Sequence, residues 1–125
     1  MEPLYIKAKS SYQPDIILDN VNGIFELSGR SLMENAVAFF QPVLDWFTEY
    51  VKQPNSMTNL VIKLDYFNTA SAKQLIDIFI TLEKILQTGK KAKITWYYDE
   101  EDEVILERGN ELKTISQVPF DLKVL

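Results

Sequence analysis

The sequence has 125 residues, of which 46% are hydrophobic and 12% aromatic, and its formal net charge is −5. This length suits one domain with a real core, and the acidic excess argues against a nucleic-acid binder, which normally presents positive charge. Cysteine and histidine are absent, which excludes disulfides, thiolate metal sites and catalysis by Ser-His-Asp, Cys-His or HExxH arrangements.

The first part of the chain predicts three strands. Leu4–Lys9 alternates loosely between apolar and polar residues, as a strand does. Two short apolar runs, Ile16–Leu18 and Ile24–Leu27, flank the segment Asp19–Gly23. Apolar runs around an Asn/Gly turn predict a hairpin, after which Ser28–Arg30 is expected to leave the sheet.

A helix is predicted from about Leu32 to Lys52, because apolar residues recur there at helical spacing. Ser31 and Glu34 have the spacing of a capping box, in which each side chain binds a backbone N–H of the first turn. Pro42 lies inside this run and lacks a backbone N–H. We therefore expect a kink near Gln41 or a second helical segment.

The second half of the chain alternates strands and helices. An apolar strand at 60–64 precedes a helix at about 71–87, which a glycine closes. A strand at 93–98, rich in β-branched and aromatic residues, precedes a helix at about 101–114, and 120–125 is a last strand. The order β-β-β-α-β-α-β-α-β predicts a single α/β domain, with helices packed over a mixed sheet.

Neither the beginning of the chain nor its apolar runs indicates export or membrane insertion. Residues 1–5 lack the basic start and apolar run of a signal peptide. The longest apolar runs are far too short to span a bilayer. We therefore expect a cytoplasmic protein that does not insert into membranes.

The polar turn after Leu64 holds the most informative residues. Asn68, Thr69 and Ser71 each carry an oxygen that can accept a backbone N–H and cap the following helix. Ser71 is the favoured cap, because Gln74 follows it at capping-box spacing. On residue chemistry alone, Thr69 is either an ordinary polar turn residue or a hydroxyl available for modification.

Three segments together resemble one family: Gly29–Ala36, Leu64–Lys73 and Trp96–Glu103. They are similar to the SiaC family of regulatory phosphoproteins, and the resemblance covers nearly the whole chain. Its most specific part is the Tyr-Phe-Asn-Thr-x-Ser-x-Lys stretch within the second segment. Met33 and Ala70 depart from the family pattern, which is expected to hold proline and serine at these positions.

The resemblance implies a bacterial, STAS-like signalling protein, similar to anti-sigma-factor antagonists, with a phosphorylated threonine that matches Thr69. It also implies a protein kinase, an opposing phosphatase and an effector bound in the unphosphorylated state. In the best-known version the effector is a diguanylate cyclase and the output is biofilm regulation. A phosphate suits a helix start, whereas a partner packed there would have to bury about −1.5 to −2 charges.

The residues around Thr69 are the expected partner-binding surface: Tyr66, Phe67, Asn68, Ala70 and Lys73. Aromatic side chains are enriched at the centre of protein interfaces. Tyr66 and Phe67 are therefore anchors for a partner if exposed and core residues if buried, and burial is favoured for Phe67.

Two charged stretches have less specific patterns. The acidic run Asp99–Glu103 lacks the Asp-x-Asp-x-Asp-Gly layout of a calcium loop, so a solvated helix start is favoured over a cation site. Lys90, Lys91 and Lys93 are favoured as a solubilising rim over a phosphate site. We therefore expect no metal and no cofactor.

Three functions remain open from the sequence alone. The favoured one is a non-enzymatic signalling protein switched at Thr69. The others are an interaction scaffold without phosphorylation and a carboxylate-based enzyme using acids such as Asp65 or Asp99. The enzyme is least favoured, because the sequence has no Gly-rich phosphate loop, metal-ligand cluster or nucleophile paired with a base. Exposed edge strands permit dimerisation without requiring it.

Overall fold

Six strands form one mixed sheet, and three helices connect its parallel strands. The computed structural model describes residues 1–125. In chain order the elements are β1 (Leu4–Ile6), β2 (Pro14–Asp19), β3 (Ile24–Ser31), α1 (Ala36–Tyr50), β4 (Met57–Phe67), α2 (Thr69–Gln87), β5 (Lys91–Tyr98), α3 (Glu103–Ile115) and β6 (Phe120–Val124). This order confirms the predicted α/β arrangement.

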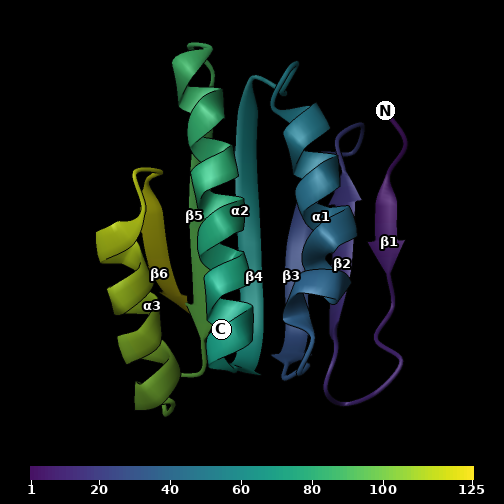
Figure 1. Ribbon diagram of the computed structural model, residues 1–125. Helices are drawn as coiled ribbons and strands as arrows, with labels where there is room; N and C mark the ends of the chain where they lie inside the picture. The colour runs from purple at the N-terminus through teal and green to yellow at the C-terminus, as the bar shows by residue number, and fades with distance from the viewer.

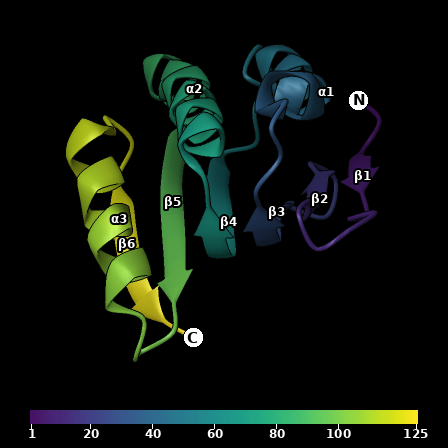
Figure 2. The same ribbon diagram turned by 60° about the horizontal axis from the view of Figure 1, so that its bottom comes forward.

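The strands lie side by side in the order of the chain, from β1 to β6. The pairs β1–β2 and β2–β3 are antiparallel, and the pairs from β3 to β6 are parallel. Right-handed crossovers between parallel strands place successive helices on the same face, as Figures 1 and 2 show. The carboxyl ends of β3, β4 and β5 therefore meet the starts of all three helices at one end of the sheet.

Buried and half-buried side chains alternate along β4, because the helices cover only one face of the sheet. Leu60, Ile62 and Leu64 are buried beneath the helices, while Val61 and Lys63, on the opposite face, are half-buried. A side-chain period of two residues gives a strand one apolar face and one mixed face. None of the three helices is both long and apolar enough to cross a membrane.

The end of β3 differs from the prediction. Ser28–Arg30 does not leave the sheet, because β3 continues through Ser31 with a register shift between Gly29 and Arg30. Gly29 has a φ of 96°, a backbone angle that glycine adopts at little cost. It lies opposite a bulge at Asp65 of β4, the residue left between Leu64 and Tyr66, which pair with Gly29 and Arg30. The bulge keeps Ser31 paired with Phe67 at the end of β4.

The start of α1 also differs. Asn35 caps this helix by accepting from the Ala38 N–H at 3.2 Å. The predicted capping box of Ser31 and Glu34 is therefore wrong, because Ser31 is a buried strand residue. Pro42 lies within α1 without dividing it, so the alternative of a second helical segment is also wrong.

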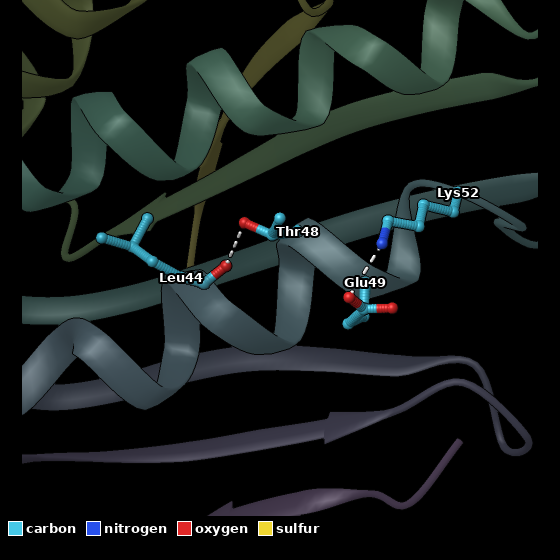
Figure 3. A network of polar contacts seen from close by, with 4 residues as sticks. All are labelled: Leu44, Thr48, Glu49 and Lys52. Atoms are coloured by element: carbon cyan, nitrogen blue, oxygen red, sulfur yellow. Dashed lines mark hydrogen bonds and ion pairs between the residues drawn. The ribbon is translucent and has the colours of Figure 1, made fainter.

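Polar contacts on the outer surface of α1 are local (Figure 3). The Thr48 hydroxyl donates to the Leu44 carbonyl at 2.8 Å, and Lys52 pairs with Glu49 at 2.9 Å. Exposed ion pairs contribute only about 0–1 kcal/mol. The buried face of α1 therefore holds it to the sheet.

The remaining elements follow the prediction closely. β4 extends to Phe67 instead of Leu64, and α2 begins at Thr69, within two residues of the expected start. Gly89, with a φ of 84°, follows α2 as the predicted terminator. Asp102 caps α3 by accepting from the Ile105 N–H at 3.0 Å. The acidic run thus begins a helix, as favoured.

A carboxylate anchors the edge strand β1. The Tyr5 hydroxyl donates to Asp19 at 2.9 Å across β1 and β2, and the Asn22 side chain donates to the same carboxylate at 2.7 Å. Hydrogen bonds to a carboxylate favour its charged form. These bonds, led by that from the Asn22 side chain, lower the pKa of Asp19 below its ordinary value.

This lowered pKa predicts a pH dependence of stability. The contribution of Asp19 is fully present above the unfolded-state pKa of about 3.9 and is lost as pH falls through the lower folded-state pKa. We expect the free energy of unfolding in urea to fall more steeply below about pH 5 for the natural protein than for Asp19→Asn. Asp121→Asn, at an exposed position, is the control. Equal slopes for the natural protein and Asp19→Asn would contradict the assignment.

Gly109 allows α3 to lie close to β5. A Cβ atom at this position would be 2.6 Å from Trp96 Nε1 and 2.7 Å from Leu122 Cδ2. The Trp96 ring is fully buried and donates its N–H to the Ile105 carbonyl at 3.2 Å, so it has no room to move aside. Gly109 therefore sets the position of α3, including the neighbouring Arg108.

We expect Gly109→Ala to destabilise the protein. Overpacking against the immobile Trp96 ring costs up to about 3 kcal/mol, which the gain of about 1 kcal/mol in helix propensity offsets only in part. Urea unfolding measures the difference, and Asn110→Ala on the exposed side of α3 is the matched control. A Gly109→Ala protein as stable as the natural one would show that α3 can shift away from β5.

Candidate functional site

The turn between β4 and α2 presents Thr69 on the surface. Thr69 is the first residue of α2, and its side chain is exposed. It lies at the end of the sheet where α1 also starts (Figure 1). The structure therefore gives Thr69 the exposed helix-start position that the sequence predicted.

Asn68 holds this turn in place. Its side-chain oxygen accepts from the Ser71 N–H at 2.9 Å, and its side-chain nitrogen donates to the Met33 carbonyl at 3.0 Å. Its backbone N–H donates to the Ser31 carbonyl at 3.0 Å. Asn68 is thus the helix cap, and the prediction that favoured Ser71 is wrong.

Ser71 has a different, buried role. Its hydroxyl donates to the Ser31 carbonyl at 2.9 Å and accepts from the Ser31 hydroxyl at 2.7 Å. Both serines are fully buried. Neither hydroxyl is accessible to a modifying enzyme, so Thr69 carries the exposed aliphatic hydroxyl of this turn. No local pattern indicates this contact, because its two residues are 40 positions apart.

The predicted partner-binding residues divide into exposed and buried groups. Phe67 is 1% exposed, and its ring centroid lies 5.5 Å from that of Trp96 in an edge-on contact. This confirms the favoured core position and excludes Phe67 from direct contact with a partner. Tyr66 is 45% exposed, and Ala70 and Lys73 are exposed on α2.

Sequence reasoning missed Arg108, which reaches the turn from α3. One of its terminal nitrogens donates to the Phe67 carbonyl at 2.7 Å. Its guanidinium carbon lies 3.9 Å from the centroid of the Phe67 ring and 5.8 Å from that of Tyr66. Both ring contacts are within the range of cation–π attraction. The structure therefore places a cation beside the turn that carries Thr69.

The surface around Thr69 is open, with a hollow beside it. This hollow of about 460 Å³ is lined by Tyr12, Leu32, Met33 and Glu34. It adjoins the turn, because the Met33 carbonyl accepts the side-chain bond from Asn68. A protruding side chain of another molecule can enter it.

The acids considered for catalysis are not gathered in a cleft. Neither Asp65 nor Asp99 lines any of the four surface hollows. No three acidic side chains converge as metal ligands would. The lysine cluster Lys90, Lys91 and Lys93 borders a hollow at the opposite end of the sheet from Thr69. The lysine cluster is therefore separate from the Thr69 turn.

Comparisons with known proteins identify relatives over nearly the whole chain. The profile of the SiaC family of regulatory phosphoproteins matches residues 6–125. An uncharacterised protein of Pseudomonas aeruginosa (strain UCBPP-PA14) is 30% identical over 123 residues, which cover 98% of this chain and 97% of that protein.

Solved structures agree with the sequence comparisons. Apo-SiaC from Pseudomonas aeruginosa superimposes with a TM-score of 0.89 at 28% identity, covering 98% of this chain and 99% of that chain. A second match comes from the crystal structure of the diguanylate cyclase SiaD in complex with its activator SiaC, from the same organism. It has a TM-score of 0.89 at 29% identity, with 98% and 99% coverage.

We expect Asn68→Ala to cost about 1–2 kcal/mol of stability, because it removes a helix cap. It also removes the bond to the Met33 carbonyl. Thr69→Ala at the adjacent exposed position is the matched control and should change stability by no more than about 0.5 kcal/mol. Urea unfolding measures both. Equal costs for the two variants would mean that Asn68 does not cap α2.

Proposed function

The chain belongs to the SiaC family of regulatory phosphoproteins, and we propose that Thr69 is the phosphorylated residue through which it is regulated. The observation that carries this proposal is the accessibility of Thr69 at the start of α2. The neighbouring serines, Ser31 and Ser71, are buried and hydrogen-bonded to each other. A serine/threonine kinase that reaches this turn therefore meets one aliphatic hydroxyl, that of Thr69.

The fold is suited to tolerate a phosphate at Thr69. The first amides of a helix have no intrahelical acceptors, and the positive end of the helix dipole favours an anion. Asn68, and not Thr69, makes the side-chain bonds that hold the turn. Phosphorylation therefore changes the charge of the surface while leaving the turn's own hydrogen bonds in place.

The binding of a partner to this surface depends on the charge that phosphorylation of Thr69 adds. Its contact area includes Tyr66, Ala70 and Lys73, together with the adjacent hollow that Met33 lines. Phosphorylation adds about −1.5 to −2 charges, and burying them in an interface without a counter-charge is costly. The unphosphorylated protein binds, and the phosphorylated protein releases its partner.

We propose that this partner is a diguanylate cyclase. The support is the solved complex in which SiaC from Pseudomonas aeruginosa is the activator of the diguanylate cyclase SiaD. The protein then acts by docking and not by catalysis, and a protein kinase and a phosphatase set its state at Thr69.

Intact-mass analysis of the protein purified from its own cells tests the modification. A species heavier by about 80 Da, one phosphoryl group, is expected, and peptide mapping should assign it to Thr69. The proposal would be overturned by a phosphoryl group found on another residue instead. It would also be overturned if the protein carried no phosphoryl group under conditions in which the cyclase is inactive.

Substitutions at Thr69 test the consequence for docking. Thr69→Ala should keep cyclase binding and lose regulation, since it removes the acceptor oxygen without adding charge. Thr69→Glu should remain folded, because an acid suits a helix start, but bind at least about tenfold more weakly, a difference of about 1.4 kcal/mol.

The binding is measured by titrating each folded variant against the diguanylate cyclase of the same organism. Thr48→Glu is the matched control, because it places the same acid on the exposed surface of α1 (Figure 3). Thr48 lies near the end of α1, whereas the Thr69 turn lies at the end of the sheet where α1 starts (Figure 1). Equal affinities for Thr69→Ala and Thr69→Glu, together with no loss on authentic phosphorylation, would leave Thr69 as an ordinary turn residue.

A further inference from the structure

Arg108 carries a positive charge that no carboxylate in the structure neutralises. The two ion pairs of the protein join Lys52 to Glu49 and Lys63 to Glu26. The side chain of Arg108 makes one hydrogen bond, to the Phe67 carbonyl. A guanidinium has five N–H donors, so most of its donors remain available in a protein with an excess of acidic residues.

The guanidinium lies within reach of Thr69. Its acceptor, the Phe67 carbonyl, belongs to the residue two positions before Thr69. Consecutive Cα atoms are about 3.8 Å apart, so the Cα atoms of Phe67 and Thr69 are no more than about 8 Å apart. Both the arginine and a phosphothreonine side chain can rotate to close this distance.

Three cations surround the turn, and Arg108 is the best suited to hold a phosphate. Lys73 lies one helical turn beyond Thr69 but is exposed, and Arg30 is exposed on β3 opposite Tyr66. Arg108 is half-buried and ordered against the Phe67 ring, so less conformational entropy is lost when it binds. Its planar fork also matches two phosphate oxygens, which a lysine cannot do. The carboxylate of Asp65, four residues before Thr69, is exposed, so solvent and salt screen its repulsion of a phosphate.

We propose that Arg108 reads the phosphorylation state of Thr69 from within the molecule. The proposal rests on the proposed function of Thr69. The phosphate binds donors of Arg108 that the Phe67 carbonyl does not use and draws the guanidinium away from the Tyr66 ring. Phosphorylation thus alters the support of an exposed aromatic side chain on the docking surface, in addition to adding negative charge there.

The test uses full-length protein with phosphothreonine incorporated at position 69 through an expanded genetic code. Phosphorus NMR then follows the second ionisation of the phosphate against pH. Contact with a guanidinium favours the dianion, so its pKa should rise by about half a unit or more when Arg108 is replaced by Gln. Lys73→Gln removes the same charge from an exposed position and should raise the pKa less.

Equal phosphate pKa values for the natural sequence and Arg108→Gln would overturn the proposal, as would a larger change in Lys73→Gln. Arg108→Lys keeps the charge without the fork and should give an intermediate value. This second variant decides the question if Arg108→Gln does not fold, since a phosphate pKa unchanged in Arg108→Lys would also overturn the proposal. Because phosphothreonine is installed directly, a cell that never phosphorylates Thr69 would refute the proposed function without affecting this titration.

Discussion

The side chain of Asn68 connects two parallel βα units at the end of the sheet. It accepts from an amide at the start of α2 and donates to the Met33 carbonyl before α1, while its backbone N–H reaches the Ser31 carbonyl at the end of β3. These bonds fix the place where β4 becomes α2. Because Asn68 meets the structural requirements of the turn, the hydroxyl of Thr69 is free to carry chemistry.

The buried serine pair beneath this turn makes its position specific. Ser31 and Ser71 are fully buried and hydrogen-bond to each other. A buried hydroxyl without its partner costs about 1–3 kcal/mol, so a shift of α2 along β3 is penalised. Apolar packing alone tolerates such slippage more readily. The pair therefore holds the exposed Thr69 at a defined point on the surface that a kinase or partner meets.

Local patterns predicted most of the elements, and long-range contacts caused the errors. Apolar runs around an Asn/Gly turn predicted the hairpin, helical periodicity predicted both later helices, and the family resemblance is what singles out Thr69 as the proposed site. The predicted start of α1 was wrong because Ser31 pairs with Phe67 in the sheet. A capping pattern in the sequence does not reveal such a strand pairing. Arg108 was missed because its contact spans 41 positions. A glycine inside a helical pattern, as at position 109, was the available signal for close packing of α3.

The order of the strands has a consequence for how the chain reaches its native state. Every strand pairs with the strands that precede and follow it in the chain, so no strand has to insert between two that are already joined. The sheet can grow outward from its amino-terminal hairpin as synthesis proceeds, each βα unit adding to an existing edge. Partners in the parallel pairs are one strand–helix unit apart, as Phe25 and Leu60 are, so the entropic cost of closing each loop does not grow as the sheet extends. Each βα unit covers the edge left by the unit before it, so only one growing edge at a time awaits its partner while later residues are made.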